Sequence, residues 1–456
     1  DIRSAMISAK LFILLGLAAS ALGNTFNTSN AFTVFVAFFI TSRRLDCYWT
    51  NAVYSGQSLS FVQVMRHGER APQDTYPNDP YFNDPMEPYG WGQLTNEGRT
   101  RQYDQGIFLR NRYDSFLGST YNPDVFYLQC TAVDRTKMSA MLEAAGLWKP
   151  SEKQSFKADL PWQPVTLYYQ PRSEDTLMLI WDMCPKYTKL RRAVMDSKEV
   201  QQVQSDNAVL YKELTNLTGM TIASPDDVGS LYATLKAEDQ MNLTLPEWTN
   251  DYYPDKMIPM TLYEFQLNGF TDDMKRLKGG PFLKKIVMDM LEKKEGALDP
   301  QSRKMFMYVG HDSTIVSLLD AMHLWNNQLP HYNIMTMIEL HKDDDQWNVQ
   351  VFLRNTTSHD PYPLTIPGCA TVCPLDNFIE ILKPMIPDDW EEDIRTPNFS
   401  RPLASTSAPF FWLTKIITGG STPLLRISIS FLRLSASPIM WTICSVLSVG
   451  LPTLPI

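Results

Sequence analysis

The chain has 456 residues, of which 44% are hydrophobic. A chain of this length and composition can bury a substantial core, so global disorder is excluded, and two domains or one domain with a large insertion are expected. The formal net charge at pH 7 is −9, from 41 basic and 50 acidic side chains. Because this balance offers no positive field to a polyanionic backbone, we expect no nucleic-acid partner.

The start of the chain has the pattern of a secretory signal peptide. Behind the first methionine, Met6, Lys10 precedes an apolar run over residues 11–22, with small residues near its end. This order is typical of export signals, although a buried helix is the alternative, and we predict that residues 1–23 are a signal peptide. Residues 24–57 form an N-terminal extension without an assigned role. Five sequons agree with an exported glycoprotein: Asn27, Asn216, Asn242, Asn355 and Asn398.

Six cysteines suit an oxidising compartment, but they are too few to be the main scaffold of a chain this long. Cys369 and Cys373 are separated by three residues and lie beside Pro374, which favours a local disulfide bond. A zinc site is the alternative for this pair, but no histidine or second cysteine pair with ligand spacing lies nearby. We therefore expect a disulfide here, and no metal or other cofactor in the protein.

The regular elements of the core alternate between strand and helix. Residues 58–65 are rich in apolar and β-branched side chains and stop at Arg66, so they are predicted to form a buried strand that ends in a loop. Further elements follow: helix 95–117, strand 125–130, helix 136–147, strand 305–309 and helix 313–322. This alternation predicts a parallel sheet, and open parallel sheets bind ligands at the carboxyl ends of their strands.

The middle of the chain differs from the segments on either side. Over residues 149–255 the pattern changes to polar helical stretches punctuated by prolines, which predicts an inserted, mainly helical domain. Strands return at 334–341 and 347–354, a predicted hairpin with residues 342–345 as its turn. The α/β core then consists of two segments: 58–148 and 256–393.

The tail over residues 394–456 contains no Asp or Glu and is dominated by Ser, Thr, Pro and large apolar residues. The uncharged run over 434–456 is long enough to span a bilayer, although its prolines weaken it as a helix. Three interpretations stay open: a membrane anchor, a removable lipid-anchor signal, or a tail that does not belong to the folded protein.

The densest chemical signal is the sequence Arg-His-Gly-Glu-Arg-Ala-Pro at residues 66–72, directly after the first strand. Guanidinium groups stay protonated and match phosphate oxygens in pairs, so Arg66 and Arg70 are predicted to hold a phosphoryl group. Gly68 lets the backbone approach closely. His67 would then attack phosphorus, provided that it is neutral at the attacking nitrogen.

Two further segments add to this motif, which alone would more often be an ordinary surface cluster. Arg135 follows the strand at 125–130 at a predicted helix start, and His311 with Asp312 ends the strand at 305–309. These residues bring a third guanidinium, a second imidazole and a titratable carboxyl to the same edge of the sheet. Phosphoryl transfer depends mostly on positioning and charge stabilisation, and this set supplies both without a metal.

Together these motifs resemble the histidine acid phosphatase family, in the branch of the prostatic and lysosomal enzymes. The family signature Arg-His-Gly-x-Arg-x-Pro stands at residues 66–72, and the later His-Asp signature at 311–312. The similarity runs in order over roughly residues 60–393 and includes shorter matches: Gly-Gln-Leu-Thr at 92–95, Val-Asp-Arg-Thr at 133–136, Asn-Leu-Thr at 242–244, and Pro-Gly-Cys to Cys-Pro-Leu over 367–375.

The resemblance implies an α/β fold, in which a mixed, mainly parallel sheet is flanked by helices and carries a smaller inserted helical domain. It also implies a ping-pong mechanism through a covalent phosphohistidine. Position by position, His67 would be the nucleophile and Asp312 the general acid. Four residues would bind phosphate: Arg66, Arg70, Arg135 and His311. Homodimers are common in the family, so a homodimer is a further expectation.

The predicted function is that of an acid phosphatase acting on phosphate monoesters, secreted or lysosomal, and membrane-anchored if the tail is an anchor. A phytase-type inositol-polyphosphate phosphatase is one alternative, but it would need a more basic rim than the inserted region shows. A non-catalytic secreted binding protein on the same fold is another. The intact set of arginines, histidines and Asp312 argues against that second alternative.

Two cysteines depart from the family pattern. Cys184 matches a family cysteine, but its expected partner just after Trp390 is absent. Cys130 stands near the predicted pocket, where relatives more often have a hydroxyl residue. A small buried apolar role is favoured for Cys130, and a reactive thiol is the alternative.

Overall fold

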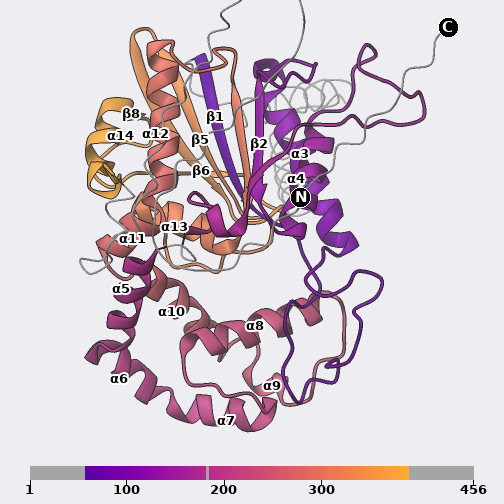
Figure 1. The fold of residues 1–456 in the computed structure, drawn as a ribbon, viewed down its shortest axis with the longest axis vertical. Coiled ribbons are helices and arrows are strands. Elements are labelled where there is room, and N and C mark those ends of the chain that lie inside the picture. The colour runs from indigo at the N-terminus through magenta and orange to yellow at the C-terminus, as the bar shows by residue number, and fades with distance from the viewer. Residues whose placement is uncertain (1–56, 181–183, 390–456) are drawn as a thin grey trace, which may run out of the picture. The chain divides into compact units, whose positions relative to one another are not determined.

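The computed structural model describes residues 57–180 and 184–389 of the chain (Figure 1). The predicted signal peptide, nearly all of the N-terminal extension and the tail over 394–456 lie outside these residues. Within the described ranges, no helix combines the length and apolar character needed to cross a bilayer.

A mixed sheet of eight strands forms the centre of the described chain (Figure 1). The spatial order is β3-β2-β4-β1-β5-β6-β7, and β8 pairs with β6. The strands are β1 Gln57–Arg66, β2 Phe126–Thr131, β3 Tyr168–Gln170, β4 Met305–Gly310, β5 Met335–Asp343, β6 Gln346–Arg354, β7 Tyr362–Leu364 and β8 Cys373–Pro374. Strands β1 to β4 pair in parallel, whereas β5 to β8 pair antiparallel. The predicted mixed sheet and the predicted hairpin are both confirmed.

The register of the parallel strands brings their carboxyl ends together. Strand β1 lies between β4 and β5, and Arg66 at its end is opposite Gly310 of β4. On the other side of β4, Cys130 of β2 is opposite Val309. Because parallel strands point the same way, the loops that follow β1, β2 and β4 leave the sheet at one edge.

Strand β1 is apolar on both faces, which explains why helices cover both sides of the sheet. Successive strand side chains point to opposite faces. Val62 and Val64 belong to the core formed with α12, α13 and α14, whereas Phe61 and Met65 belong to the core formed with α3 and α4. Figure 1 shows α3 and α4 on one side of the sheet and α12 and α14 on the other.

The helices divide into those that flank the sheet and those that pack mainly on one another. The flanking helices are α3 Asn96–Leu117, α4 Asp134–Leu147, α12 Gly280–Glu295, α13 Asp312–Ala321 and α14 Leu375–Leu382. The others are α5 Pro185–Met195, α6 Lys198–Asp206, α7 Ala208–Thr218, α8 Pro225–Gln240, α9 Thr249–Tyr252, α10 Ile258–Asn268 and α11 Asp272–Lys278. Two 3-10 turns, η1 Arg172–Glu174 and η3 Lys383–Met385, complete the set.

The helical part of the chain has its own apolar cores. One core joins α7, α8 and α10, and a second joins α5, α10 and α11. Strand β3 pairs with β2 in the main sheet, although it falls inside the segment 149–255 that was predicted as the insert. The division into two domains, with its boundaries, stays a prediction.

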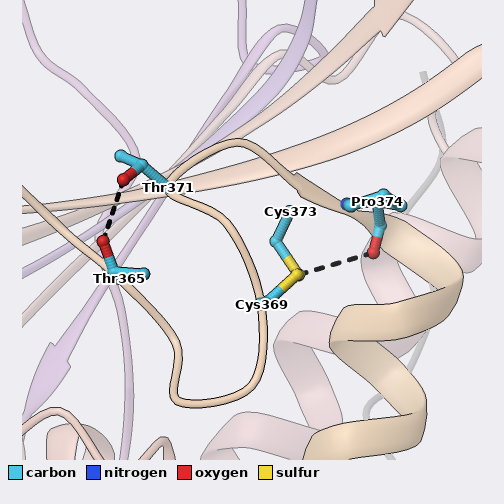
Figure 2. Close-up of a disulfide and its surroundings, with 5 residues drawn as sticks. All are labelled: Thr365, Cys369, Thr371, Cys373 and Pro374. Carbon is cyan, nitrogen blue, oxygen red and sulfur yellow. Dashed lines mark hydrogen bonds between the residues drawn. A yellow bond between two sulfur atoms is a disulfide. The ribbon is translucent and has the colours of Figure 1, made fainter.

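The predicted local disulfide is confirmed between Cys369 and Cys373, whose Cα atoms lie 5.7 Å apart (Figure 2). The bridge closes the loop that connects β7 to β8. Figure 2 also shows the hydroxyls of Thr365 and Thr371 hydrogen-bonded across this loop, at 2.8 Å. Gly368 has a φ of 86°, a conformation that glycine adopts without steric strain.

Candidate functional site

The six predicted site residues meet at the carboxyl edge of the parallel strands. Arg66 ends β1, and His67 and Arg70 lie in the loop after it. Arg135 is in the first turn of α4, directly after β2. His311 lies between β4 and α13, Asp312 begins α13, and the rings of His67 and His311 have centroids 5.5 Å apart. The sheet therefore places side chains from three separate segments around one point.

Close contact with α3 fixes the loop that carries His67. A Cβ atom at Gly68 would lie 2.6 Å from the carbonyl oxygen of Gly98, and one at Gly98 would lie 2.1 Å from that of Glu69. Both positions therefore need glycine, because any larger side chain would overlap the facing backbone. Thr95 caps the helix by accepting a hydrogen bond from the Gly98 amide, at 3.2 Å.

A buried polar network also holds this loop, and none of its four residues was among the predicted site residues. Asn333 donates to Glu69 at 2.9 Å, and Gln102 donates to the Asn333 side-chain oxygen at 2.6 Å. Arg101 pairs with the Glu69 carboxylate at 2.6 Å. These bonds satisfy a buried carboxylate and fix the backbone between Arg66 and Arg70, because charge-assisted bonds are short and strong. No local pattern around Asn333 indicates this role, since its partners are more than 200 residues away in the chain.

The hydrogen bonds of His67 determine which ring nitrogen carries the proton. Nδ1 lies 2.8 Å from the carbonyl oxygen of Gly68, and Nε2 lies 3.0 Å from Nε of Arg135. A carbonyl oxygen only accepts and a guanidinium only donates. The proton is therefore on Nδ1, and Nε2 has a lone pair that faces the guanidinium.

The surroundings of His67 also keep it neutral. Burial lowers its pKa well below the ordinary value, and the positive charges of Arg135 and Arg66 lower the pKa further. The side chain of His67 is only 2% exposed. A neutral imidazole with a free lone pair is the form that can act as a nucleophile.

Three guanidinium groups gather around this imidazole. Burial, together with the neighbouring Arg70, lowers the pKa of Arg135 to about 10. The buried Nε atoms of Arg66 and Arg70 have no hydrogen-bond partner within the described part of the chain. Buried donors without a hydrogen bond are unfavourable, and so are like charges at close range, unless an anion lies beside them. The cluster is therefore arranged to receive a negatively charged group with several acceptor oxygens.

His311 is held by the neighbouring strand and by its own helix. Its Nε2 lies 3.0 Å from the hydroxyl of Thr131 at the end of β2, and its backbone amide donates to the hydroxyl of Thr314 at 3.1 Å. Burial and the charge of Arg135 lower the pKa of His311. The lowered pKa keeps His311 neutral at this edge of the sheet.

Asp312 occupies the first position of α13, and its carboxylate pairs with Arg66 at 2.8 Å. The Ser313 amide also donates to this carboxylate, at 2.6 Å. Burial acts to raise the pKa of Asp312, but Arg66, His311, the Ser313 amide and Arg70 together outweigh it, and the pKa lies below its ordinary value. The side chain remains 32% exposed, so it can reach a bound molecule.

Tyr332 is a further site residue that sequence reasoning missed. Its ring lies under the guanidinium of Arg66, 4.2 Å from the central carbon, and 5.6 Å from the ring of His67. This arrangement is a cation–π contact, which helps to orient Arg66. Tyr332 precedes β5 in an irregular segment, where no motif indicates a role.

A pocket of about 410 Å³ opens beside Arg66 and Asp312. Its wall comes from both parts of the described chain: from the loops at the sheet edge, including Tyr332, and from helices α5, α8, α10 and α11. Small-molecule sites are typically of this size, about 300–1,000 Å³. The pocket therefore leaves room for more than the group that the arginines would hold.

Cys130 lies in β2 and is fully buried. Burial raises the pKa of its thiol to about 12. Because the thiolate is the reactive form, this environment favours the apolar packing role over a reactive one. Within the described residues, no three His, Cys, Asp or Glu side chains are grouped as a metal site.

Residues 58–350 match the family model of the histidine phosphatase superfamily, branch 2. The chain belongs to this superfamily. It is 34% identical to human (Homo sapiens) prostatic acid phosphatase over 357 residues, which cover 77% of this chain and 92% of the relative. It is 32% identical to rat (Rattus norvegicus) lysosomal acid phosphatase over 387 residues, 84% of this chain and 89% of the relative.

Two further comparisons agree with this placement in the histidine phosphatase superfamily. Venom acid phosphatase Acph-1 of Apis mellifera is 34% identical over 332 residues, 72% of this chain and 85% of the relative. The structure of Hafnia alvei phytase with myo-inositol hexakis sulphate has a TM-score of 0.57 and 17% identity, and the match covers 76% of this chain and all of that one, 100%. At this identity the likeness shows the fold alone.

The pKa of His67 gives a test of the site geometry. We expect His67 to stay neutral well below pH 6.5, and we expect its pKa to rise in Arg135→Gln, because a neighbouring positive charge is removed. Ring chemical shifts followed by NMR against pH would measure this, with the signal assigned by its absence in His67→Gln. Arg192→Gln, an exposed change on α5, is the control and should leave the titration in place. An unchanged pKa in Arg135→Gln would contradict the proposed contact.

Proposed function

We propose that the protein is an acid phosphatase that hydrolyses phosphate monoesters through a phosphohistidine on His67. The observation that carries the proposal is the neutral imidazole whose Nε2 lone pair faces the guanidinium of Arg135, with the charges of Arg66 and Arg70 close to this pair. The similarity to enzymes named acid phosphatases supports it independently. Both lines point to the same chemistry, attack of a histidine nitrogen on a bound phosphoryl group.

The arginines supply binding and charge stabilisation in this mechanism. The phosphate oxygens would accept hydrogen bonds from Arg66, Arg70, Arg135 and His311, and the bound anion would displace the Arg135 Nε from the His67 lone pair. Nε2 then forms a bond to phosphorus while the bond to the leaving oxygen breaks. In the second half of the reaction a water oxygen attacks phosphorus and the water gives a proton to the Asp312 carboxylate, the bond to Nε2 breaks, and phosphate leaves. No metal takes part in these steps.

Asp312 is proposed as the acid that protonates the leaving oxygen. In the structure without substrate its pKa is low because Arg66 neutralises it. A bound phosphate would draw the Arg66 charge to itself and place a negative charge beside the carboxylate. Both changes raise the pKa of Asp312. Substrate binding and acidic pH therefore both favour the protonated form of Asp312, which supplies the proton that the leaving group needs.

The composition of the pocket wall bears on the phytase-type alternative. The charged residues that line it comprise three acidic and three basic side chains: Asp226, Glu264, Asp312, Arg66, Lys236 and Lys278. A site for an inositol polyphosphate would need an excess of positive charge, because several phosphates are bound at once. Burial raises the pKa of Glu264 to about 8, so its carboxyl is mostly protonated at acidic pH. The excess of positive charge in the wall is then small, which favours substrates with few negative groups.

We also propose that the protein is exported or lysosomal and glycosylated. The predicted signal peptide, the sequons and the similarity to lysosomal acid phosphatases support this. Asn216 and Asn242 are exposed, whereas the amide of Asn355 is half-buried and donates to Gln328 at 2.9 Å. The homodimer and a C-terminal anchor stay predictions from the family and from the tail.

The first functional test is His67→Ala. We expect it to reduce turnover of an aryl phosphate by about 10³-fold or more, because the nucleophile is lost. The melting temperature should stay close to that of the unmodified protein. Rapid quench with labelled substrate should trap an acid-labile, base-stable phosphoenzyme only when His67 is present. His359→Ala, on the exposed surface, is the control, and turnover by His67→Ala at the control rate would exclude the mechanism.

The second test separates the acid role of Asp312 from helix capping. Asp312→Asn keeps the size and hydrogen bonds of the side chain but has no proton to transfer. We expect phosphoenzyme formation from alkyl phosphates to fall by about 10²–10⁴-fold, and far less from p-nitrophenyl phosphate, whose leaving group needs no proton. Asn also caps helices well, so a capping role predicts little change for either substrate. Equal slowing of phosphoenzyme formation from both substrates would indicate that another residue is the general acid.

The third test concerns export. Expression of the full chain in eukaryotic cells should give a protein in the medium or in lysosomes whose chain starts near Asn24. Mass analysis before and after glycosidase treatment should show glycans at Asn216 and Asn242, because both are exposed. An intact N-terminus together with unmodified asparagines would contradict this localisation.

A further inference from the structure

The pocket beside Arg66 and Asp312 must receive the part of the substrate that leaves. Its volume of about 410 Å³ exceeds what a phosphate group occupies, and its wall runs from the phosphate-binding arginines to helices α8 and α10. Aromatic rings of Tyr232, Tyr332 and Phe265 line it together with charged groups. We therefore expect the charged groups of the wall to determine which leaving groups bind in the pocket.

Most of the charges in this wall are balanced by a neighbour. Arg66 pairs with Asp312 at 2.8 Å, and Asp226 pairs with Arg191 at 2.7 Å. Lys278 is buried close to Glu264, whose negative charge favours the ammonium form of the lysine.

Lys236 on α8 is different. In residues 57–180 and 184–389, no ion pair or hydrogen bond joins its ammonium to another side chain. It is half-buried, and its Nζ lies 5.7 Å from the ring centroid of Tyr232 on its own helix. Burial and the charge of Arg66 together lower its pKa to about 8, so it remains charged at acidic pH. Lys236 thus brings to the pocket wall a positive charge with no ion-pair partner in the described part of the chain, although Glu69, Asp312 and Asp239 act on it electrostatically.

A half-buried ammonium without a counterion is unfavourable, and an anion placed beside it would be strongly held. Arg66 and Asp312 both influence Lys236 electrostatically, so such an anion would lie near the scissile bond. A single ammonium matches one singly charged group.

We propose that Lys236 is a specificity-determining residue that binds a carboxylate on the leaving group of the substrate. Preferred substrates are then phosphate monoesters that carry one carboxylate a few bonds from the ester oxygen. This inference rests on the proposed phosphatase function and adds a substrate class to it. The competing role for the same ammonium is direct contact with the phosphate that is transferred.

Matched substrates distinguish these two roles. The 3- and 4-carboxyphenyl phosphates would be compared with the corresponding carboxamides, which have nearly the same shape but no charge, at about pH 6, where the carboxylate is ionised. The measured quantity is the ratio of kcat/KM for the carboxylate to that for the carboxamide. In Lys236→Met we expect this ratio to fall by about tenfold, because one charge-assisted contact is lost.

Two variants serve as controls. Lys236→Arg keeps the positive charge and should retain most of the ratio, whereas Lys212→Met removes an exposed lysine of α7 and should not change it. Melting temperatures would show that each variant is folded.

An unchanged ratio in Lys236→Met overturns the inference. Contact of Lys236 with the phosphate predicts this result with both kcat/KM values lowered together, and no role in binding predicts it with neither value lowered. Equal loss of the ratio in the Met and Arg variants also overturns it, because charge would not be the cause. Failure of the unmodified protein to hydrolyse even the carboxamides would instead contradict the phosphatase function itself.

Discussion

The site depends on one constraint, the burial of a neutral imidazole among three guanidinium groups. Arg135 reaches Nε2 of His67 at 3.0 Å, while the Gly68 carbonyl fixes the proton on Nδ1 at 2.8 Å. The same positive charges that would bind a phosphate also keep the histidine deprotonated. Binding and nucleophilicity therefore have a common electrostatic origin, and neither could be changed without the other.

Such a concentration of positive charge must be supported by the rest of the fold. Gly68 in the His67 loop and Gly98 in α3 approach so closely that no side chain fits at either position. Glu69, Asn333 and Gln102 then form a buried network beneath it. On the other side, the ring of Tyr332 holds Arg66 in place. These residues need not touch a substrate, yet they determine the geometry of those that would.

The pocket combines groups from the sheet edge with groups from the helical region. The residues predicted to bind phosphate lie at the end of β1 and directly after β1, β2 and β4, whereas Lys236 and Glu264 come from α8 and α10. On the proposed function, substitutions on these two helices would change the preferred leaving group and leave the residues proposed for phosphoryl transfer unchanged.

The strands, the main helices and the six site residues could be predicted from local sequence. Apolar periodicity and compact motifs such as Arg-His-Gly-x-Arg can be recognised within a few residues. The parallel register then explains why motifs from distant segments meet at one edge. Only the tertiary structure brings Asn333, Tyr332 and Lys236 to the site, and the role of Lys236 in substrate binding is a proposal. Their effect arises from charges and rings that approach across the fold, and the balance of charge in a pocket is a property of the assembled wall. No single segment of the sequence contains it.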